Sequence, residues 1–273
     1  MTKLWGSEIF NMAHSAYTIM GIINLTPDSF SDGGSYRDSG EAFERLLRYL
    51  DEGADIVDIG AESTRPQAQP ISSTEEWRRL KPLLDRIANA STPIPFSVDT
   101  YKPATMQRLL DYQPTMLNDT KSQAPHKLLE QLANRGIAYL AMHMHGEPST
   151  MQDNPLQATT VMTTLLNFFK QRISVLRNCG FADTQIWIDP GIGFGKSDHA
   201  TMHIFRNLHQ LAAIAPVAVG VSRKSWLGRY FQIDPPHARD DISSMLALAL
   251  IWQGARLIRT HDVATLHRLK RLF

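Results

Sequence analysis

The chain has 273 residues, of which 43% are hydrophobic and 20% charged, a composition typical of a globular protein with a large core. Its 28 basic and 27 acidic side chains leave a net charge of +1, so neither nucleic acid nor an anionic membrane is expected as a partner. The single cysteine, Cys179, excludes a disulfide within one chain and any multi-cysteine metal centre. Its simplest role is that of a half-buried structural thiol.

The ends of the chain and its longest apolar runs bear on location. The N-terminal residues lack the apolar core of a signal peptide, and no apolar run approaches the roughly 20 residues that span a membrane. We therefore expect a cytoplasmic protein. No Pro/Gly-rich linker divides the sequence, so residues 1–273 are expected to form a single domain.

Short apolar runs alternate with longer amphipathic stretches along the whole chain. Most of the runs are rich in Ile, Val, Leu or Met, as strands buried on both faces should be. The predicted strands are Tyr17–Leu25, Asp55–Gly60, Ile94–Asp99, Thr115–Asn118, Ile137–Met142, Gln185–Asp189, Val217–Ser222 and Arg256–Thr260.

Each predicted strand is followed by a predicted helix. Thr74, Pro103 and Pro125 provide helix-start signals, and glycines stand where several helices should end. The predicted helices are Glu41–Gly53, Thr74–Asn89, Pro103–Tyr112, Pro125–Arg135, Leu156–Cys179, Ala200–Ala213, Arg239–Gly254 and Val263–Leu272. Eight such units favour a closed (β/α)8 barrel, an α/β fold of the TIM type, over the alternative of a doubly wound open sheet.

Polar side chains follow nearly every predicted strand. In a (β/α)8 barrel the carboxyl ends of the strands carry the chemistry, so these side chains are expected to meet at one rim. Asp99, Asn118 and Asp189 together suit a flat heterocycle rich in N–H groups, such as a pterin or guanine, because carboxylates accept paired hydrogen bonds. The alternative is a structural polar network in the barrel mouth.

Cationic side chains at the same rim suit a phosphate or diphosphate. Arg65 and Arg259 provide planar, permanently charged forks, and His261 adds a further donor. The run Gly191-x-Gly193 and the glycine at position 195 resemble a phosphate loop, but could equally allow the close approach of a flat ring.

Lys224 stands at the end of the seventh strand, where it could bond a carbonyl or a ring nitrogen. A Schiff-base lysine is the competing interpretation. We disfavour it because no apolar pocket that would lower the pKa of Lys224 is evident.

Two candidate metal sites differ in their donors. Asn24, with Asp28 and Asp32, forms an oxygen-rich patch suited to Mg²⁺, which binds through few protein oxygens plus substrate phosphates. His143 and His145 raise the question of zinc, but no third ligand stands at metal spacing. Magnesium is the predicted metal.

Two long loops follow the first two strands, residues 26–34 and 63–71. Both are rich in small and polar residues and long enough to act as mobile covers over the rim. Phe30 in the first loop could close over an aromatic substrate and exclude water.

Several of these runs resemble signature stretches of the dihydropteroate synthase family, in family order from about Gly21 to the C-terminus. The two longest are the sequences from Gly21 to Gly34 and from Gly60 to Pro66. Further matches are Ser97-Val98-Asp99-Thr100, Met142-His143-Met144, the run from Asp189 to Lys196, Ser222-Arg223-Lys224-Ser225 and the run from Arg259 to Val263.

The resemblance implies a (β/α)8 barrel enzyme of folate biosynthesis, usually a homodimer. Such an enzyme joins 4-aminobenzoate to 6-hydroxymethyl-7,8-dihydropterin diphosphate with Mg²⁺, and it releases pyrophosphate and 7,8-dihydropteroate. Sulfonamides compete with the amine. Both substrates are small molecules.

The resemblance also implies roles for individual residues. Asp99, Asn118, Asp189 and Lys224 resemble the pterin-binding set, with Phe194 and Gly220 lining the ring pocket. Other implied roles are diphosphate binding for Thr64, Arg65, Arg259 and His261, magnesium binding for Asn24, and the 4-aminobenzoate pocket for Phe30, Pro66 and Ser225. The residues expected to carry the reaction are Asp32, Arg65, Asp99 and Lys224, with Asp32 stabilising the pterin cation.

Three positions depart from the family pattern. Ala61 and Gln67 stand where the family usually has glycine, and Lys121 follows Asn118 in a bulkier loop than usual. Two alternatives therefore stay open. One is a pterin-binding paralogue without synthase activity, and the other is a folate-dependent methyltransferase of the same fold, which has no use for a diphosphate clamp.

Overall fold

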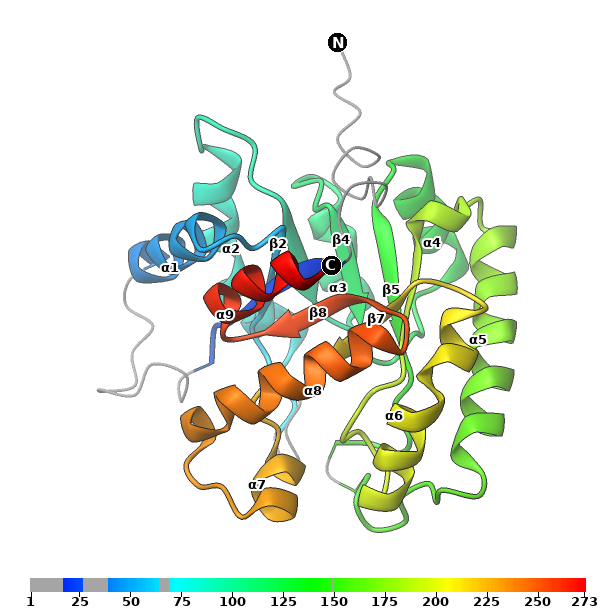
Figure 1. Cartoon of the computed structure of the whole chain (residues 1–273). Helices are drawn as coiled ribbons and strands as arrows, with labels where there is room; N and C mark the ends of the chain where they lie inside the picture. The colour runs from blue at the N-terminus through cyan, green and yellow to red at the C-terminus, as the bar shows by residue number, and fades with distance from the viewer. Residues whose placement is uncertain (1–16, 27–38, 64–68, 149) are drawn as a thin grey trace.

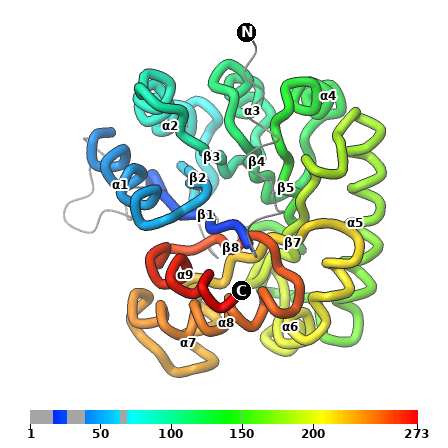
Figure 2. The backbone as a smooth tube through the Cα atoms, turned by 45° about the horizontal axis from the view of Figure 1, so that its top comes forward, coloured from blue at the N-terminus to red at the C-terminus, as the bar shows by residue number. Residues whose placement is uncertain are grey.

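The computed structural model describes residues 17–26, 39–63, 69–148 and 150–273. Its strands are all parallel and close into one barrel in chain order, as Figures 1 and 2 show. The strands are β1 Thr18–Asn24, β2 Ile56–Gly60, β3 Phe96–Asp99, β4 Met116–Asp119, β5 Ala138–Met142, β6 Ile186–Asp189, β7 Val217–Gly220 and β8 Ala255–Thr260. Pairing of β1 with β8 closes the barrel, so the (β/α)8 prediction is confirmed and the open-sheet alternative is wrong.

Helices surround the barrel (Figure 2). The described helices are α1 Ser39–Asp51, α2 Ser73–Ala88, α3 Pro103–Leu109, α4 His126–Asn134, α5 Val161–Asn178, α6 Asp198–Ala212, α7 Ser225–Phe231, α8 Asp240–Trp252 and α9 Val263–Leu269. Short 3-10 turns at Asp183–Gln185, Pro236–Arg239 and Lys270–Leu272 complete the described secondary structure. None of the described helices is both long and apolar enough to cross a membrane.

Two helix boundaries in the structure differ from the predicted ones, because tertiary contacts there outweigh the local sequence signals. The predicted helix Leu156–Cys179 begins only at Val161, because Leu156 instead pairs with the β6–α6 loop through the Gly195 carbonyl at 3.0 Å. At the start of α2, Ser72 rather than Thr74 is the cap, and its side chain accepts a hydrogen bond from the backbone N–H of Glu75 at 3.1 Å.

Helix α7 was not predicted. It has only seven residues and contains Gly228, so its local signal is weak. It is held by its contacts instead: Trp226 and Leu227 are buried, and the Arg239 guanidinium packs against Gly228.

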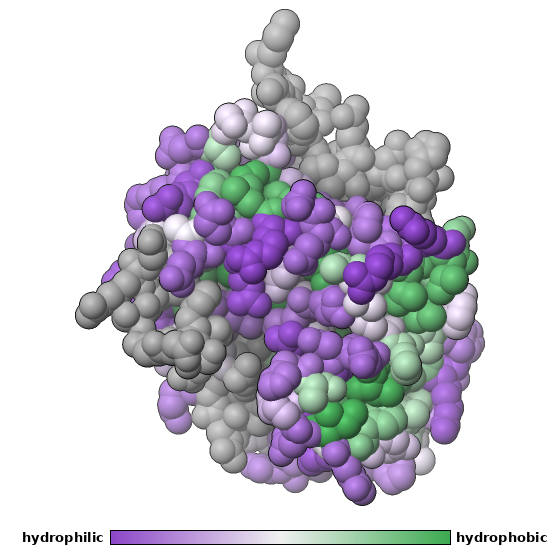
Figure 3. Space-filling view, turned by 60° about the vertical axis from the view of Figure 1, so that its left-hand side comes forward, coloured by the Kyte–Doolittle hydropathy of each residue, from purple (hydrophilic) through white to green (hydrophobic). Residues whose placement is uncertain are grey.

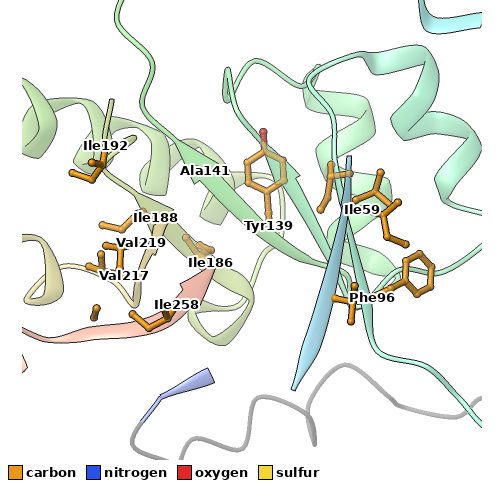
Figure 4. Packing of buried hydrophobic residues seen from close by; sticks show 14 of the residues in the cluster. Ile59, Phe96, Tyr139, Ala141, Ile186, Ile188, Ile192, Val217, Val219 and Ile258 are labelled. Carbon is orange, nitrogen blue, oxygen red and sulfur yellow. The ribbon is translucent and has the colours of Figure 1, made fainter. Parts of the chain in front are cut away.

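The core has two layers. Inside the barrel, inward-facing side chains fill the amino-terminal part, namely Met20, Ile56, Met116, Ala138, Leu140, Trp187, Ala218 and Leu257. The larger layer lies between strands and helices, and Figure 4 shows residues such as Tyr139, Ile188 and Ile258 within it. The surface in Figure 3 is mostly hydrophilic, with hydrophobic residues in separate patches.

Side-chain alternation along each strand places the site. Ile56 is in the inner apolar layer, so Asp58, two residues on, points to the same interior one level higher. The same spacing leads from Met116 to Asn118, from Trp187 to Asp189 and from Leu257 to Arg259. The apolar floor of the barrel thus ends where a polar layer begins.

Candidate active site

The predicted ring-binding residues meet at the carboxyl ends of neighbouring strands. Strand pairing sets Asp99 beside Asn118, and Gly220 beside Arg259. Asp189 ends the strand that pairs with β5 at Met142. The convergence on which the sequence analysis depended is therefore present in the structure.

Asp58 is a central member of this layer, and the sequence analysis missed it. Its carboxylate is fully buried and accepts from Arg259 Nε at 2.6 Å and from Asn118 Nδ2 at 3.1 Å. The predicted site residues were drawn from the ends of strands and the loops after them, whereas Asp58 stands in the middle of β2. A carboxylate inside an otherwise apolar strand was the available signal, because burying an unpaired charge is costly.

Arg259 joins three strands through two carboxylates. Besides Asp58, its guanidinium reaches Asp99 Oδ2 with Nη2 at 3.3 Å. Burial raises the pKa of Asp99 to about 7, with Arg259 opposing the rise and Asp58 adding to it. Arg259, which was predicted as a diphosphate contact, thus has its guanidinium against the acids of the ring pocket.

One carboxylate oxygen of Asp189 forms a hydrogen bond within the protein. Its Oδ1 accepts from the backbone N–H of Gly191 at 2.7 Å, and burial raises the pKa of its carboxyl above the usual range. No hydrogen bond joins Oδ2 to another residue in the described ranges. Asp189 therefore retains an acceptor for a ligand N–H.

The glycine run after β6 serves the backbone of the neighbouring loop. Gly191 and Gly195 have positive φ angles of 66° each. A Cβ on Gly191 would lie 2.0 Å from the His143 carbonyl oxygen, and a Cβ on Gly195 would lie 2.0 Å from that of His145. These two glycines are thus required for packing against the β5–α5 loop, a role that neither sequence interpretation included.

Lys196 connects the β5–α5 and β6–α6 loops by hydrogen bonds. Its buried ammonium contacts His143 Nδ1 and the His143 carbonyl, each at 3.0 Å, and the Phe194 carbonyl at 2.9 Å. Burial lowers the pKa of His143 to about 3, with Lys196 adding to the effect. The Nδ1 atom of the His143 ring is thus already in contact with Lys196. In the described part of the chain, no group of three His, Cys, Asp or Glu side chains is arranged to bind a metal ion.

Lys224 lies beside one aromatic ring and among charged side chains of the pocket. Its ammonium stands 4.5 Å from the centre of the Phe194 ring and bonds the Ile192 carbonyl. Burial lowers the pKa of Lys224 to about 8, against the attraction of Asp189. This direction differs from the sequence-based interpretation, in which no surroundings that would lower the pKa of Lys224 were evident, and the role of Lys224 stays a prediction.

The titration of Lys224 gives a testable pH dependence. A lowered pKa means that the ammonium is lost as pH rises through about 8, between about pH 7 and pH 9. Asp189, Asp99 and Arg259 are the charged groups facing it. We expect pterin affinity, measured by calorimetry, to fall across this range in the wild type.

The matched variant for this test is Lys224→Arg, which stays charged throughout. It should bind more weakly at neutral pH but lose the fall above pH 8, taking about 8 as the Lys224 pKa. An equal fall in both proteins would assign the pH dependence to another group.

The remaining predicted residues that the structure describes also border the pocket. Asn24 ends β1, and a Cβ on Gly60 would lie 3.7 Å from Asn24 Oδ1 and 3.9 Å from Asp99 Oδ2. His261 Nδ1 lies 3.0 Å from Ser222 Oγ, which fixes the ring orientation. Ser225 is the first residue of α7.

Five predicted site residues lie outside the described ranges, together with other predicted features. The predicted site residues are Phe30, Asp32, Thr64, Arg65 and Pro66, and the other features are Asp28, Gln67 and most of both predicted cover loops. Their roles stay predictions.

The two described departures from the family pattern are accommodated by the fold. Ala61 is fully buried in the core, where its methyl group adds packing. Lys121 is turned to the edge of the mouth, with Nζ 2.5 Å from Glu147 Oε2 and 4.5 Å from the centre of the Tyr101 ring. Neither residue contacts the ring-binding set through a hydrogen bond or ion pair.

Comparison with known proteins now adds to this geometry. The model of the family described as pterin binding enzyme matches residues 20–261. The chain is also 38% identical over 275 residues to the dihydropteroate synthase of Neisseria meningitidis serogroup C, covering 98% of this chain and 95% of that protein. The chain belongs to the dihydropteroate synthase family of pterin-binding enzymes.

Solved structures of the family have the same fold. A Yersinia pestis dihydropteroate synthase with a sulfonamide drug is 36% identical with a TM-score of 0.85, covering 94% of this chain and 92% of that one. The Xanthomonas albilineans enzyme with 4-aminobenzoic acid (35%, TM-score 0.84) and with 7,8-dihydropteroate (33%, 0.81) each cover 94% of this chain and 91% of that one.

Proposed function

We propose that this chain is a dihydropteroate synthase that condenses 6-hydroxymethyl-7,8-dihydropterin diphosphate with 4-aminobenzoate. The observation that carries the proposal is the acceptor set at the barrel mouth, in which Asn118 and Asp189 are buried and Asp99 is half-buried, with Lys224 and Arg259 beside it. Membership of the family and complexes of relatives with 4-aminobenzoic acid and 7,8-dihydropteroate support it.

The proposed condensation depends on stabilising the charges that develop as the pterin–diphosphate bond breaks. The bond between the pterin methylene carbon and the diphosphate oxygen breaks, and the departing pyrophosphate takes the electron pair. The neutral amine nitrogen of 4-aminobenzoate forms the new C–N bond and then loses a proton to solvent or pyrophosphate. Carboxylates around the ring stabilise the positive charge that develops on the pterin, so no strong general base is required.

The position of each described group fits a task in this reaction. Asp189 and Asn118 bind the N–H edge of the ring, and Lys224 contacts its polar atoms from beside Phe194. His261 is half-buried at the end of β8, the position that we propose contacts the diphosphate. Cations at that position would neutralise the leaving group.

A coupled pyrophosphate-release assay tests the function. Release that requires both the pterin diphosphate and 4-aminobenzoate supports the synthase. Pterin binding without release would instead indicate the paralogue that lacks synthase activity. Methyl transfer from a reduced folate to a corrinoid would indicate the methyltransferase. A sulfonamide should compete with 4-aminobenzoate in the same assay.

We also propose Mg²⁺ as the metal, held by Asn24. The side-chain oxygen of Asn24, at the end of β1, is a hard donor that suits this ion, and a single donor is too few to bind it alone. Mg²⁺ supplies charge neutralisation for a diphosphate. We therefore expect little binding of Mg²⁺ to the free protein by calorimetry, clear binding once pterin diphosphate is present, and weaker coupling in Asn24→Ala. Tight binding to the free protein would point to another site.

A homodimer is the proposed assembly, with α8 in the interface. Its Met245 and Trp252 side chains are 66% and 68% exposed and lie seven residues apart on one helix face. Replacing both by Glu should convert a dimer to a monomer in sedimentation velocity. Leu47→Glu, on α1, is the control that should leave the dimer intact. A wild-type protein that sediments as a monomer would contradict the proposal.

The cytoplasmic location stays a prediction.

A further inference from the structure

Asp58 makes contacts that bear on two residues of the ring pocket at once. It lies in the barrel interior with no exposed surface, 2.6 Å from Arg259 Nε and 3.1 Å from Asn118 Nδ2. Both contacts use the same oxygen, Oδ2. The other oxygen, Oδ1, has no hydrogen-bond partner within the described ranges.

The contact with Asn118 decides which end of that amide a ligand meets. A carboxylate only accepts hydrogen bonds, whereas an amide has a donating nitrogen and an accepting oxygen. Asn118 must therefore turn Nδ2 toward Asp58, and its Oδ1 bonds no other described residue. Asn118 is thus held with its acceptor available to the pocket.

The contact with Arg259 decides where the guanidinium lies. Asp58 binds Nε and Asp99 binds Nη2, so carboxylates on two different strands fix the plane of the fork. The remaining N–H groups and the flat face are left for a ligand. The Arg259 side chain retains 21% exposure, which makes these groups reachable from the mouth.

We propose that Asp58 is a positioning residue that sets the donor–acceptor polarity of Asn118 and the orientation of Arg259 for pterin binding. The inference rests on the proposed function, because the ligand it concerns is the pterin. Asp58 acts through these two side chains, and no direct contact between Asp58 and the reacting atoms is proposed.

Asp58→Leu is the first test, because it keeps the size of the side chain and removes the acceptor that Arg259 and Asn118 share. Asn118 then loses the contact that fixes its amide, and it can turn over and present N–H to a ligand edge that is itself rich in N–H. Arg259 keeps only its contact with Asp99. We expect affinity for 6-hydroxymethyl-7,8-dihydropterin, measured by calorimetry, to fall about 10-fold or more.

Asp58→Asn separates the position of the acceptor from the charge of Asp58. Its amide oxygen can take the place of Oδ2 and accept from both Arg259 and Asn118, while its NH₂ takes the place of Oδ1, which has no partner within the described ranges. Asp58→Asn should therefore bind the pterin more tightly than Asp58→Leu, a rescue expected only if the position of the acceptor matters. Turnover of Asp58→Leu should show the loss mainly in KM for the pterin substrate.

Ser97→Ala is the matched control for disturbing the barrel interior. Ser97 is fully buried, pairs in register with Asp58, and has an Oγ without a partner among the described residues. Its affinity should equal that of the wild type, and thermal melting should show each variant folded.

The outcomes distinguish the inference from the proposed function. Unchanged affinity in folded Asp58→Leu, an equal loss in Ser97→Ala, or an Asp58→Asn variant that binds no better than Asp58→Leu would each overturn the positioning role. If Asp58→Leu does not fold, Asp58→Asn decides: affinity close to that of the wild type supports the role, and a loss of about 10-fold or more overturns it. A wild type that binds no pterin would instead overturn the proposed function.

Discussion

Asp189→Asn is expected to reduce pterin affinity by about 100-fold while the fold survives, the size of a lost charged hydrogen bond combined with an unpaired buried group. The reason is the committed oxygen: Oδ1 accepts from the Gly191 N–H at 2.7 Å, so an amide at this position must keep its oxygen there. Its NH₂ would then replace Oδ2 and face the N–H groups of the ligand.

Calorimetry with a pterin and thermal melting together test this expectation. The variant should melt no lower than the wild type, because a buried carboxyl whose pKa is raised by its surroundings has been removed. Asp183→Asn is a suitable control, since Asp183 is exposed and its ion pair within the described ranges is with the surface residue Arg177. A folded Asp189→Asn variant with wild-type affinity would remove Asp189 from the ring-binding set.

Arg259→Ala is expected to lose both affinity and stability. Pterin diphosphate binding should weaken by about 10-fold or more, because a charged hydrogen-bond donor is lost. The free energy of unfolding should fall by roughly 3 kcal/mol, since removing one partner of a buried pair leaves an uncompensated charge, here on the fully buried Asp58. Denaturant unfolding and calorimetry would report the two losses separately.

A surface arginine provides the comparison for Arg259. Arg206 is exposed on α6, so Arg206→Ala should change both quantities little. Adding Asp58→Asn to Arg259→Ala should return part of the lost stability, because the orphaned charge is removed as well. If Arg259→Ala were as stable as the wild type, the ion pair with Asp58 would not be important for the fold.

The chain order of strands and helices could be predicted because it is local. Apolar runs of strand length and amphipathic stretches mark each element within a few residues, and parallel strands bring their carboxyl ends to one rim. For this reason Asp99, Asn118, Asp189 and Arg259 could be placed together before any coordinates were known. The short helix α7 was missed because its stability comes from Trp226 and from Arg239, which lies outside the helix.

Long-range pairing could not be read from the sequence. Asp58 and Arg259 are separated by 201 positions, so nothing near either residue indicates the other. The glycines at 191 and 195 looked like a ligand loop, but their conformation is dictated by carbonyls of a different loop. The lowered pKa of Lys224 likewise depends on burial by residues from other elements.

Periodicity and motifs are properties of residues close together in the chain, so they were enough to predict a (β/α)8 barrel with a polar rim and a resemblance to the pterin-binding family. Which carboxylate holds Arg259, which end of Asn118 faces a ligand, and in which direction the pKa of Lys224 shifts are features of the folded barrel. Hydrogen bonds and desolvation depend on distances in space, and barrel closure brings together residues that lie far apart along the chain.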